Sequence, residues 1–167
     1  LFVTYPLQCM EILKKTLDEA HIRVTDIVAG PIAESIPLLT KTQKVAGVLL
    51  LNIGAGVTSL LVYENNTPLL VSTIPVGGDD ITKDLALGLK ITLEEAEDIK
   101  CGKSKLPHSV RRVEEIVEAR IEDLCVKINK ELDRIYRREL LPGGVIVCGG
   151  STNVPRLEHV LRNELKL

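Results

Sequence analysis

Three β-rich runs joined by short connections constrain the fold more than any other feature of this sequence. The runs cover residues 45–51, 57–63 and 68–75, and the connections between them span only 52–56 and 64–67. Strands joined this tightly pair antiparallel, because a parallel pair needs a crossover of about a dozen residues or more. The sequence therefore predicts a three-stranded antiparallel meander. Its first run is almost wholly apolar, which is typical of a strand covered on both faces.

Helical periodicity and breaker residues predict further elements before and after the meander. Before it we expect a helix over 6–20, a short strand over 23–29, and a short helix from Gly30 to about Leu39. After it we expect a helix that Asp79 or Asp80 caps and that ends near Lys90, and then a helix over 92–100 with Thr92 and Glu95 as its capping box. A loop over 101–107 and a long helix from Ser109 to Glu139 should follow. The predicted chain ends with a strand over 145–148 and a last helix from near Asn153. Together these elements predict an α/β domain with a mixed sheet flanked by helices.

Composition and cysteine spacing argue against several classes of function. The 167 residues are 45% hydrophobic and 26% charged with a net charge of −2, which disfavours a general nucleic-acid binder. Aromatic residues make up 2%, which disfavours base-stacking surfaces, and the four cysteines lack metal-ligand spacing and are typical of free thiols in a reducing cytoplasm. The sequence shows no signal peptide. Because it begins at Leu1 rather than Met and stops within a predicted helix at Leu167, we expect a piece of a longer protein.

Three glycine-rich turns lie at predicted strand ends, at Gly54-Ala55-Gly56, Gly77-Gly78 and Gly149-Gly150. Glycine lets the backbone approach a ligand closely, and backbone amides, together with the Thr58 hydroxyl, can line a phosphate. Each turn alone fits an ordinary tight turn equally well. Because strand ends in α/β sheets converge on one crevice, the three turns together indicate a ligand site.

The same segments resemble the actin-like ATPases and, within them, the FtsA family of bacterial cell-division proteins. Actin-like ATPases have a strand–DxGxGxT–strand hairpin, and this chain has NIGAGVT at 52–58. The runs IPVGGDDITKDLA (74–86), LEEAEDIK (93–100) and VCGGS (147–151) are similar to FtsA segments in order and spacing. The PilM family of actin-like pilus-assembly proteins is a close rival that shares the NIG-type loop and IPVGG, whereas VEAR (117–120) favours FtsA.

This resemblance implies the second lobe of an actin-like (RNase H-like) fold. It assigns 1–44 to the end of the first lobe and its crossover helix, 45–90 to the core sheet of the second lobe, 91–140 to a tip subdomain with the long helix, and 141–167 to the return strand and helix.

The resemblance also implies an ATP site with Mg²⁺. By this resemblance, the β- and γ-phosphates face Gly54, Ala55, Gly56 and Thr58, and phosphate or ribose lies beside Gly77 and Gly78. Ribose and adenine are reached by Glu97 and Lys100. The base packs against Gly149, Gly150 and Ser151. Without the resemblance, Glu97 and Lys100 would indicate a solvated helix face with i,i+3 pairing.

Asn52 departs from the family pattern, because the resemblance places an Asp there beside the Mg²⁺ water shell. A neutral amide cannot supply that carboxylate, which hard Mg²⁺ prefers as a ligand. Ser59 likewise stands where the family often has Asp. We therefore predict at most a weak ATPase and assign no catalytic residue.

The predicted long helix separates its charges by sign on a helical wheel. One flank is acidic, and the other carries Arg112, Ile116, Arg120, Asp123 and Lys127. In FtsA-like proteins the helix with the residue matching Arg120 receives the acidic, apolar tail of FtsZ, so the resemblance implies a partner face there. The alternative is a solvated, salt-bridged surface.

By resemblance, the whole protein would be a cytoplasmic scaffold at the inner face of the membrane. It would polymerise like actin and link the FtsZ ring to the membrane through a segment outside this chain. Two alternatives are a PilM-like component of a type IV pilus machine and the lobe of a sugar or acetate kinase. A kinase needs a carboxylate base near the phosphate loop, and Asn52 counts against that class.

Overall fold

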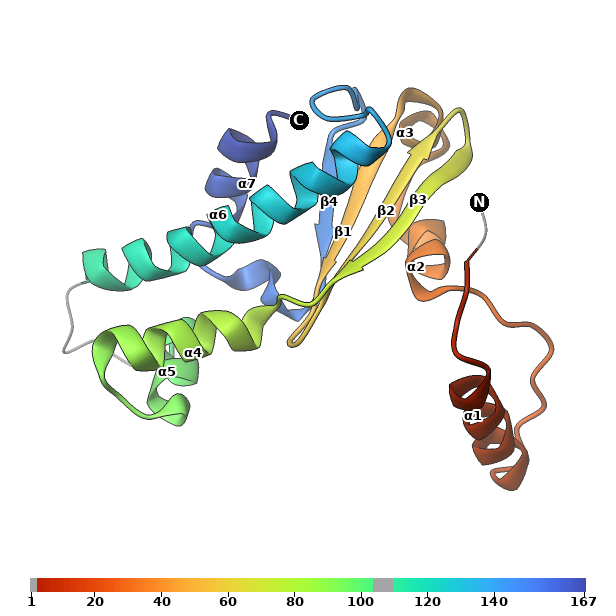
Figure 1. Cartoon of the computed structure of the whole chain (residues 1–167), viewed down its shortest axis with the longest axis horizontal. Coiled ribbons are helices and arrows are strands. Elements are labelled where there is room, and N and C mark those ends of the chain that lie inside the picture. The colour runs from red at the N-terminus through yellow and green to blue at the C-terminus, as the bar shows by residue number, and fades with distance from the viewer. Residues whose placement is uncertain (1–2, 104–109) are drawn as a thin grey trace.

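The computed structural model describes residues 3–103 and 110–167 and shows a four-stranded mixed sheet with helices on both faces (Figure 1). Strands β1 (Val48–Ile53), β2 (Thr58–Glu64) and β3 (Thr67–Ile74) pair antiparallel in sequence order. Strand β4 (Val145–Cys148) pairs parallel with β1, which gives the order β3-β2-β1-β4. The predicted α/β class, the mixed sheet and the antiparallel meander are confirmed.

Strand β1 is buried on both faces, as its apolar sequence predicted. On one face, Leu49, Leu51 and Ile53 belong to a large core with residues of α4 (Gly78–Leu89), α6 (Val110–Arg134) and α7 (Leu157–Leu165). On the other face, Val48 and Leu50 belong to a smaller core under α2 (Gly30–Leu38). Alternate residues of β1 therefore point toward α6 and toward α2.

The helices after the meander begin with the capping residues that the sequence indicated. In α5 (Leu93–Lys100), Thr92 and Glu95 form the predicted capping box. Helix α4 begins at Gly78, one residue before the expected caps, and Asp80 stands in its first turn. Asp80 nevertheless satisfies the start of the helix, because its Oδ2 accepts a hydrogen bond from the Gly77 amide at 3.0 Å.

Two predictions before β1 are wrong in detail. Residues 23–29 form no strand, because they run between two helices without a neighbouring strand to pair with. Helix α3 (Lys41–Ala46) was not expected and takes up the first residues of the predicted strand. A Thr40–Gln43 capping box starts α3, and Gly47 ends it with φ of 101°, so β1 begins at Val48.

The long helix and the last helix also differ from their predicted bounds. Helix α6 ends at Arg134, because Tyr136 takes a left-handed φ of 55° and the Arg137 amide donates to the Leu132 carbonyl at 2.9 Å. Its predicted first residue, like most of the loop predicted over 101–107, lies outside the described residues. The last helix is preceded by a 3₁₀ turn, η1 (Gly150–Asn153), so α7 begins only at Leu157.

Helix α1 (Leu7–Glu19) is present as predicted but stands apart from the sheet (Figure 1). It buries none of its side chains, and Leu7 and Ile12 are exposed. No helix in the described ranges is both long and apolar enough to cross a membrane.

Candidate functional site

The three glycine-rich turns meet at one edge of the sheet, where hydrogen bonds tie them together. The Gly54 carbonyl accepts from the Gly78 amide at 2.9 Å and from the Ser151 hydroxyl at 3.1 Å. The Ala55 carbonyl accepts from the Asp79 amide at 2.8 Å. Segments almost a hundred residues apart in sequence thus form one rigid rim, as the convergence of strand ends predicted.

Glycine is required where these turns touch. A Cβ added to Gly77 would lie less than 3.0 Å from the Ala55 carbonyl oxygen, and one added to Gly78 would lie 2.5 Å from the Ser151 hydroxyl. Gly149 has a left-handed φ of 100°, and a Cβ there would strike Ile53. The close approach, rather than a ligand, explains these three glycines.

The turn between β1 and β2 differs, because its tip is open. Ala55 and Gly56 are exposed, and a Cβ on Gly56 would meet nothing within 4 Å. Within the described part of the chain, the amides of Ala55 and Gly56 donate to no acceptor, whereas those of Gly77, Gly78 and Asp79 are all engaged. This tip therefore offers free amides that could hold a phosphate, whereas Gly77 and Gly78 offer none.

Thr58 is not in the open part of the site. Its side chain is fully buried, and its hydroxyl donates to the Val76 carbonyl at 2.8 Å. The expectation that this hydroxyl faces a phosphate is therefore corrected, because the hydroxyl holds the β1–β2 turn against the segment that leads into α4.

An open hollow of about 330 Å³ lies beside the tied turns. It brings together many of the predicted nucleotide residues, which are Ala55, Gly78, Glu97, Lys100, Gly150 and Ser151. A larger hollow of about 430 Å³ lies along β4 and α7. We favour the smaller one as the ligand site, because it combines free backbone amides with a buried ammonium group.

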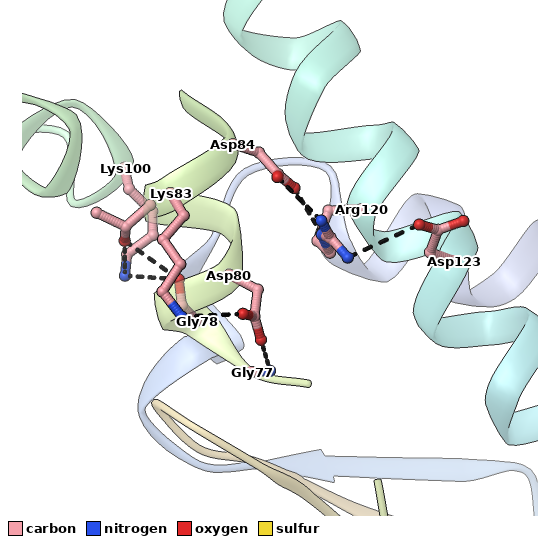
Figure 2. A network of polar contacts seen from close by, with 9 residues as sticks. Gly77, Gly78, Asp80, Lys83, Asp84, Lys100, Arg120 and Asp123 are labelled. Carbon is pink, nitrogen blue, oxygen red and sulfur yellow. Dashed lines mark hydrogen bonds and ion pairs between the residues drawn. The ribbon is translucent and has the colours of Figure 1, made fainter. Parts of the chain in front are cut away.

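That ammonium group belongs to Lys100, whose side chain is only 9% exposed. Its Nζ donates to the Gly78 carbonyl at 3.2 Å (Figure 2). It also donates to the Thr82 hydroxyl at 2.9 Å and pairs with Glu97 at 2.7 Å. The hydrogen bonds from Lys100 and Thr82 lower the pKa of Glu97. The i,i+3 pair is thus present, but it also fixes a positive charge beside the first turn of α4.

Asn52 lies behind this rim, on the face of β1 that α2 covers. Its side-chain Nδ2 donates to Oε1 of Glu34 in α2 at 2.7 Å. The second oxygen of Glu34 is buried and has no hydrogen-bond partner among the described residues. Sequence reasoning missed Glu34, since a single carboxylate in a short helix carries no motif.

The predicted partner face on α6 is partly covered by α4. Arg120 forms a bidentate pair with Asp84 of α4, and its Nη2 lies 2.9 Å from Asp84 Oδ1 (Figure 2). This hydrogen bond raises the pKa of Arg120. Ile116 packs against Gly88 of α4. The other three predicted residues are exposed, and they are Arg112, Asp123 and Lys127.

Solved structures with the same arrangement define the class of this domain. MreB5 of Spiroplasma citri bound to AMPPNP has a TM-score of 0.79 at 15% identity, covering 98% of this chain and 59% of that chain. A PilM–PilN type IV pilus biogenesis complex has a TM-score of 0.74 at 22% identity, and the match covers 95% of this chain and 45% of that chain. The ethanolamine utilization protein EutJ from Carboxydothermus hydrogenoformans has a TM-score of 0.69 at 23% identity. This match covers 89% of this chain and 51% of the EutJ chain. The domain is an actin-like lobe.

Sequence comparison gives the family. The family model described as cell division protein FtsA matches residues 49–167. Cell division protein FtsA of Bacillus subtilis is 29% identical over 93% of this chain and 41% of its own length. Cell division protein FtsA of Streptococcus pneumoniae is 30% identical over 93% of this chain and 38% of its own length. This chain belongs to the FtsA family of cell-division proteins. It spans about two fifths of the length of these curated relatives.

Proposed function

We propose that this chain is the ATP-binding second lobe of an actin-like cell-division scaffold. One observation carries the proposal: the free amide of Ala55 and the buried ammonium of Lys100, which pairs with Glu97, line one hollow. Backbone amides and a fixed cation are the groups that bind phosphate oxygens. The same hollow leaves room on the η1 side, at Gly150 and Ser151, for a base and ribose.

Magnesium is expected to accompany the nucleotide. Among the described residues no group of three or more metal-binding side chains occurs. Mg²⁺ in nucleotide sites is usually held by one or two carboxylates together with phosphates and waters. When bound, the ion would neutralise charge on the phosphates.

A charge placed at the tip of the β1–β2 turn tests the nucleotide site. We expect Ala55→Glu in the full-length protein to weaken ATP binding at least about tenfold, because two like charges about 4 Å apart repel by about 4 kcal/mol near a protein surface. Val57→Glu is the matched control, since Val57 is exposed in the same turn but does not line the hollow. Equal weakening of ATP binding by both variants, measured by calorimetry, would contradict the site.

The open hollow also predicts how this chain behaves alone. Drug-sized ligands bind tightly when a pocket buries about 70–90% of their surface, and this hollow forms a single wall. We therefore expect these 167 residues to bind ATP far more weakly than the full-length protein. Micromolar binding by the isolated chain in calorimetry would contradict this.

We further propose that α6 receives the tail of FtsZ and that the whole protein assembles into actin-like filaments at the inner face of the membrane. The support is the FtsA family match and the exposed basic residues beside the α4–α6 contact, Arg112 and Lys127. A basic row next to an apolar contact suits an acidic, apolar peptide. The membrane contact would come from a part of the protein outside this chain.

A PilM-like role remains the second candidate, and its support is one solved structure. That structure is of a complex with PilN, and at 22% identity it shows the fold alone. A binding assay with two labelled peptides separates the roles. Binding of an FtsZ tail peptide supports the first, and binding of a PilN peptide without the FtsZ tail supports the second.

A further inference from the structure

The part of the smaller hollow that η1 contributes is uncharged. Toward the β1–β2 turn and the first turn of α4, the hollow presents the free Ala55 amide and the Lys100 ammonium group. By contrast, η1 and the residue after it contribute Gly150, Asn153 and the nearly buried Val154. Phosphate oxygens bind cations and free amides, whereas the flat face of a base packs on apolar or backbone surface. A nucleotide in this hollow is therefore expected to have its base on the η1 side.

Most polar side chains that line the hollow are already engaged. The Ser151 hydroxyl donates to the Gly54 carbonyl at 3.1 Å, and Lys100 pairs with Glu97 at 2.7 Å. Asn153 differs, because it is exposed and its side-chain amide makes no hydrogen bond within the ranges that the structure describes. That amide has one acceptor and two donors and carries no charge. Asn153 is thus free to bind a polar group that is presented on the η1 side of the hollow.

The backbone around Asn153 is held on both sides. Before it, the Thr152 amide and hydroxyl both donate to the Gly149 carbonyl, at 3.3 and 2.9 Å. After it, the Val154 amide donates to the Ser151 carbonyl at 3.2 Å. A side chain carried by a fixed turn loses less freedom when it binds than one carried by a mobile loop. The turn therefore presents the Asn153 amide to the hollow at a low cost in entropy.

The polar edge of a purine decides which base an amide can hold. Adenine presents its 6-amino group, a donor, next to a ring nitrogen that accepts. A side-chain amide matches this pattern, because Oδ1 accepts from the amino group while Nδ2 donates to the ring nitrogen. Guanine has an oxygen in place of the amino group, and this oxygen cannot donate to Oδ1.

We propose that Asn153 binds the 6-amino group of the nucleotide base and is a residue that determines specificity for adenine. The inference rests on the proposed ATP site and assigns a role to a residue outside the glycine turns. The single free neutral amide in the lining of the hollow supports it. Asn153 thus complements Ala55 and Lys100, which are placed to hold phosphate oxygens at the other side of the hollow.

Calorimetry on the full-length protein tests the contact by changing the ligand and the residue together. The two ligands are ATP and the analogue in which hydrogen replaces the 6-amino group. We expect the wild type to bind the analogue about fivefold more weakly than ATP, which is the size of one neutral hydrogen bond. In Asn153→Ala the two ligands should bind within about twofold of each other. Asn163→Ala is the matched control, because it removes the same exposed amide from α7, away from the hollow, and should keep the fivefold preference.

The thiol of Cys101 shows independently whether the nucleotide occupies the hollow. Cys101 is exposed and lines the hollow, whereas Cys9 is an exposed thiol on α1 that does not. ATP at about ten times its Kd should slow alkylation of Cys101 by N-ethylmaleimide about tenfold, because mainly the unbound protein reacts. Alkylation of Cys9 should not change. Mass spectrometry of the two cysteine-containing peptides measures both rates in one sample.

The outcomes separate this inference from the proposed function. If ATP protects Cys101 but Asn153→Ala keeps the full preference for the 6-amino group, the role of Asn153 is overturned and the ATP site stands. The same holds if the wild type binds both ligands equally. If ATP does not bind, or binds without protecting Cys101, the proposed site is overturned and this inference with it.

Discussion

The glycine turns and the α4–α6 contact both join segments that are distant in sequence, but they use different groups. At the turns, backbone carbonyls of Gly54 and Ala55 accept from the start of α4 and from Ser151. Between the helices, side chains make the join, through the Arg120–Asp84 pair and the packing of Ile116 on Gly88. The first contact is made mainly by backbone groups, with the Ser151 hydroxyl as its one named side chain, whereas the second is built from side chains.

This difference has consequences for tolerance and for function. Backbone contacts at the turns leave no room to adapt, so a single added methyl group must displace main chain. The charged pair is 27% exposed on both partners, so solvent can replace part of its energy. We therefore expect the turns to be a fixed platform for a ligand and the α4–α6 face to be the adaptable one.

The largest expected effect is at Gly77. Gly77→Ala should lower the free energy of unfolding by about 3 kcal/mol, because its Cβ would collide with the Ala55 carbonyl, a backbone atom that cannot rotate away. Gly56→Ala is the matched control in the open turn and should change stability by no more than about 0.5 kcal/mol. Urea unfolding of both variants measures the contrast, and equal losses would show that the turns do not differ.

The next effect is at the charged pair. Arg120→Ala should lower the free energy of unfolding by about 2 kcal/mol, because Asp84 loses a charge-assisted bidentate partner. A double-mutant cycle with Asp84→Ala should give a coupling of about 1 kcal/mol or more. Arg111→Ala is the control, since its side chain is 87% exposed and its one ion pair among the described residues is with Glu115. A coupling near zero would free Arg120 for a partner and favour the surface contact that the sequence predicted.

Much of the fold could be predicted from local signals in the sequence. The short connections determine the meander, and Thr92 with Glu95 marks the start of α5. The strand predicted over 23–29 failed because strand formation depends on a neighbour, which local sequence does not reveal. Helix α3 was missed because it is only six residues long, too short for an apolar periodicity, although the Thr40–Gln43 capping box marks its start.

The sequence could predict the parts of the candidate site that depend on backbone conformation. Glycine positions predicted that the three turns converge, but not which amides stay free, since that depends on which carbonyls they meet. Thr58 and Glu34 show the same limit, because a hydroxyl and a carboxylate take their roles from contacts 18 residues away in sequence. The helical wheel grouped Arg120 with Ile116, but it could not show that α4 would contact both side chains.

A smaller effect is expected at the start of α4 and depends on pH. The hydrogen bond from the Gly77 amide, together with Lys83, lowers the pKa of Asp80 in the folded protein below its usual 3.8. Stability from Asp80 is therefore present above pH 3.8 and is lost as the pH falls through the folded pKa. Asp80→Asn should lower the free energy of unfolding by about 1 kcal/mol at pH 7, and the difference should shrink below pH 3.8. A difference that stays constant with pH would contradict a role for the charge.

The smallest effect concerns partner binding at the exposed part of α6. Arg120→Glu would break the Asp84 pair as well as any partner contact, so the exposed Arg112 gives a cleaner test. Arg112→Glu should weaken binding of a labelled FtsZ tail peptide about threefold, as an exposed ion pair is worth less than about 1 kcal/mol. The weakening should shrink at high salt.

Arg111→Glu is the control for that change, because Arg111 neighbours Arg112 and both contact Glu115, yet it points to the acidic flank of α6. The two variants change the net charge equally, so a general electrostatic effect would weaken peptide binding in both alike. Fluorescence anisotropy that shows equal weakening would mean that the peptide responds to overall charge and that α6 is a solvated surface. No weakening in either variant would place the peptide elsewhere on the protein. Weakening confined to Arg112→Glu would identify the basic flank of α6 as the face that receives a partner, in contrast to the glycine turns, which backbone contacts hold together.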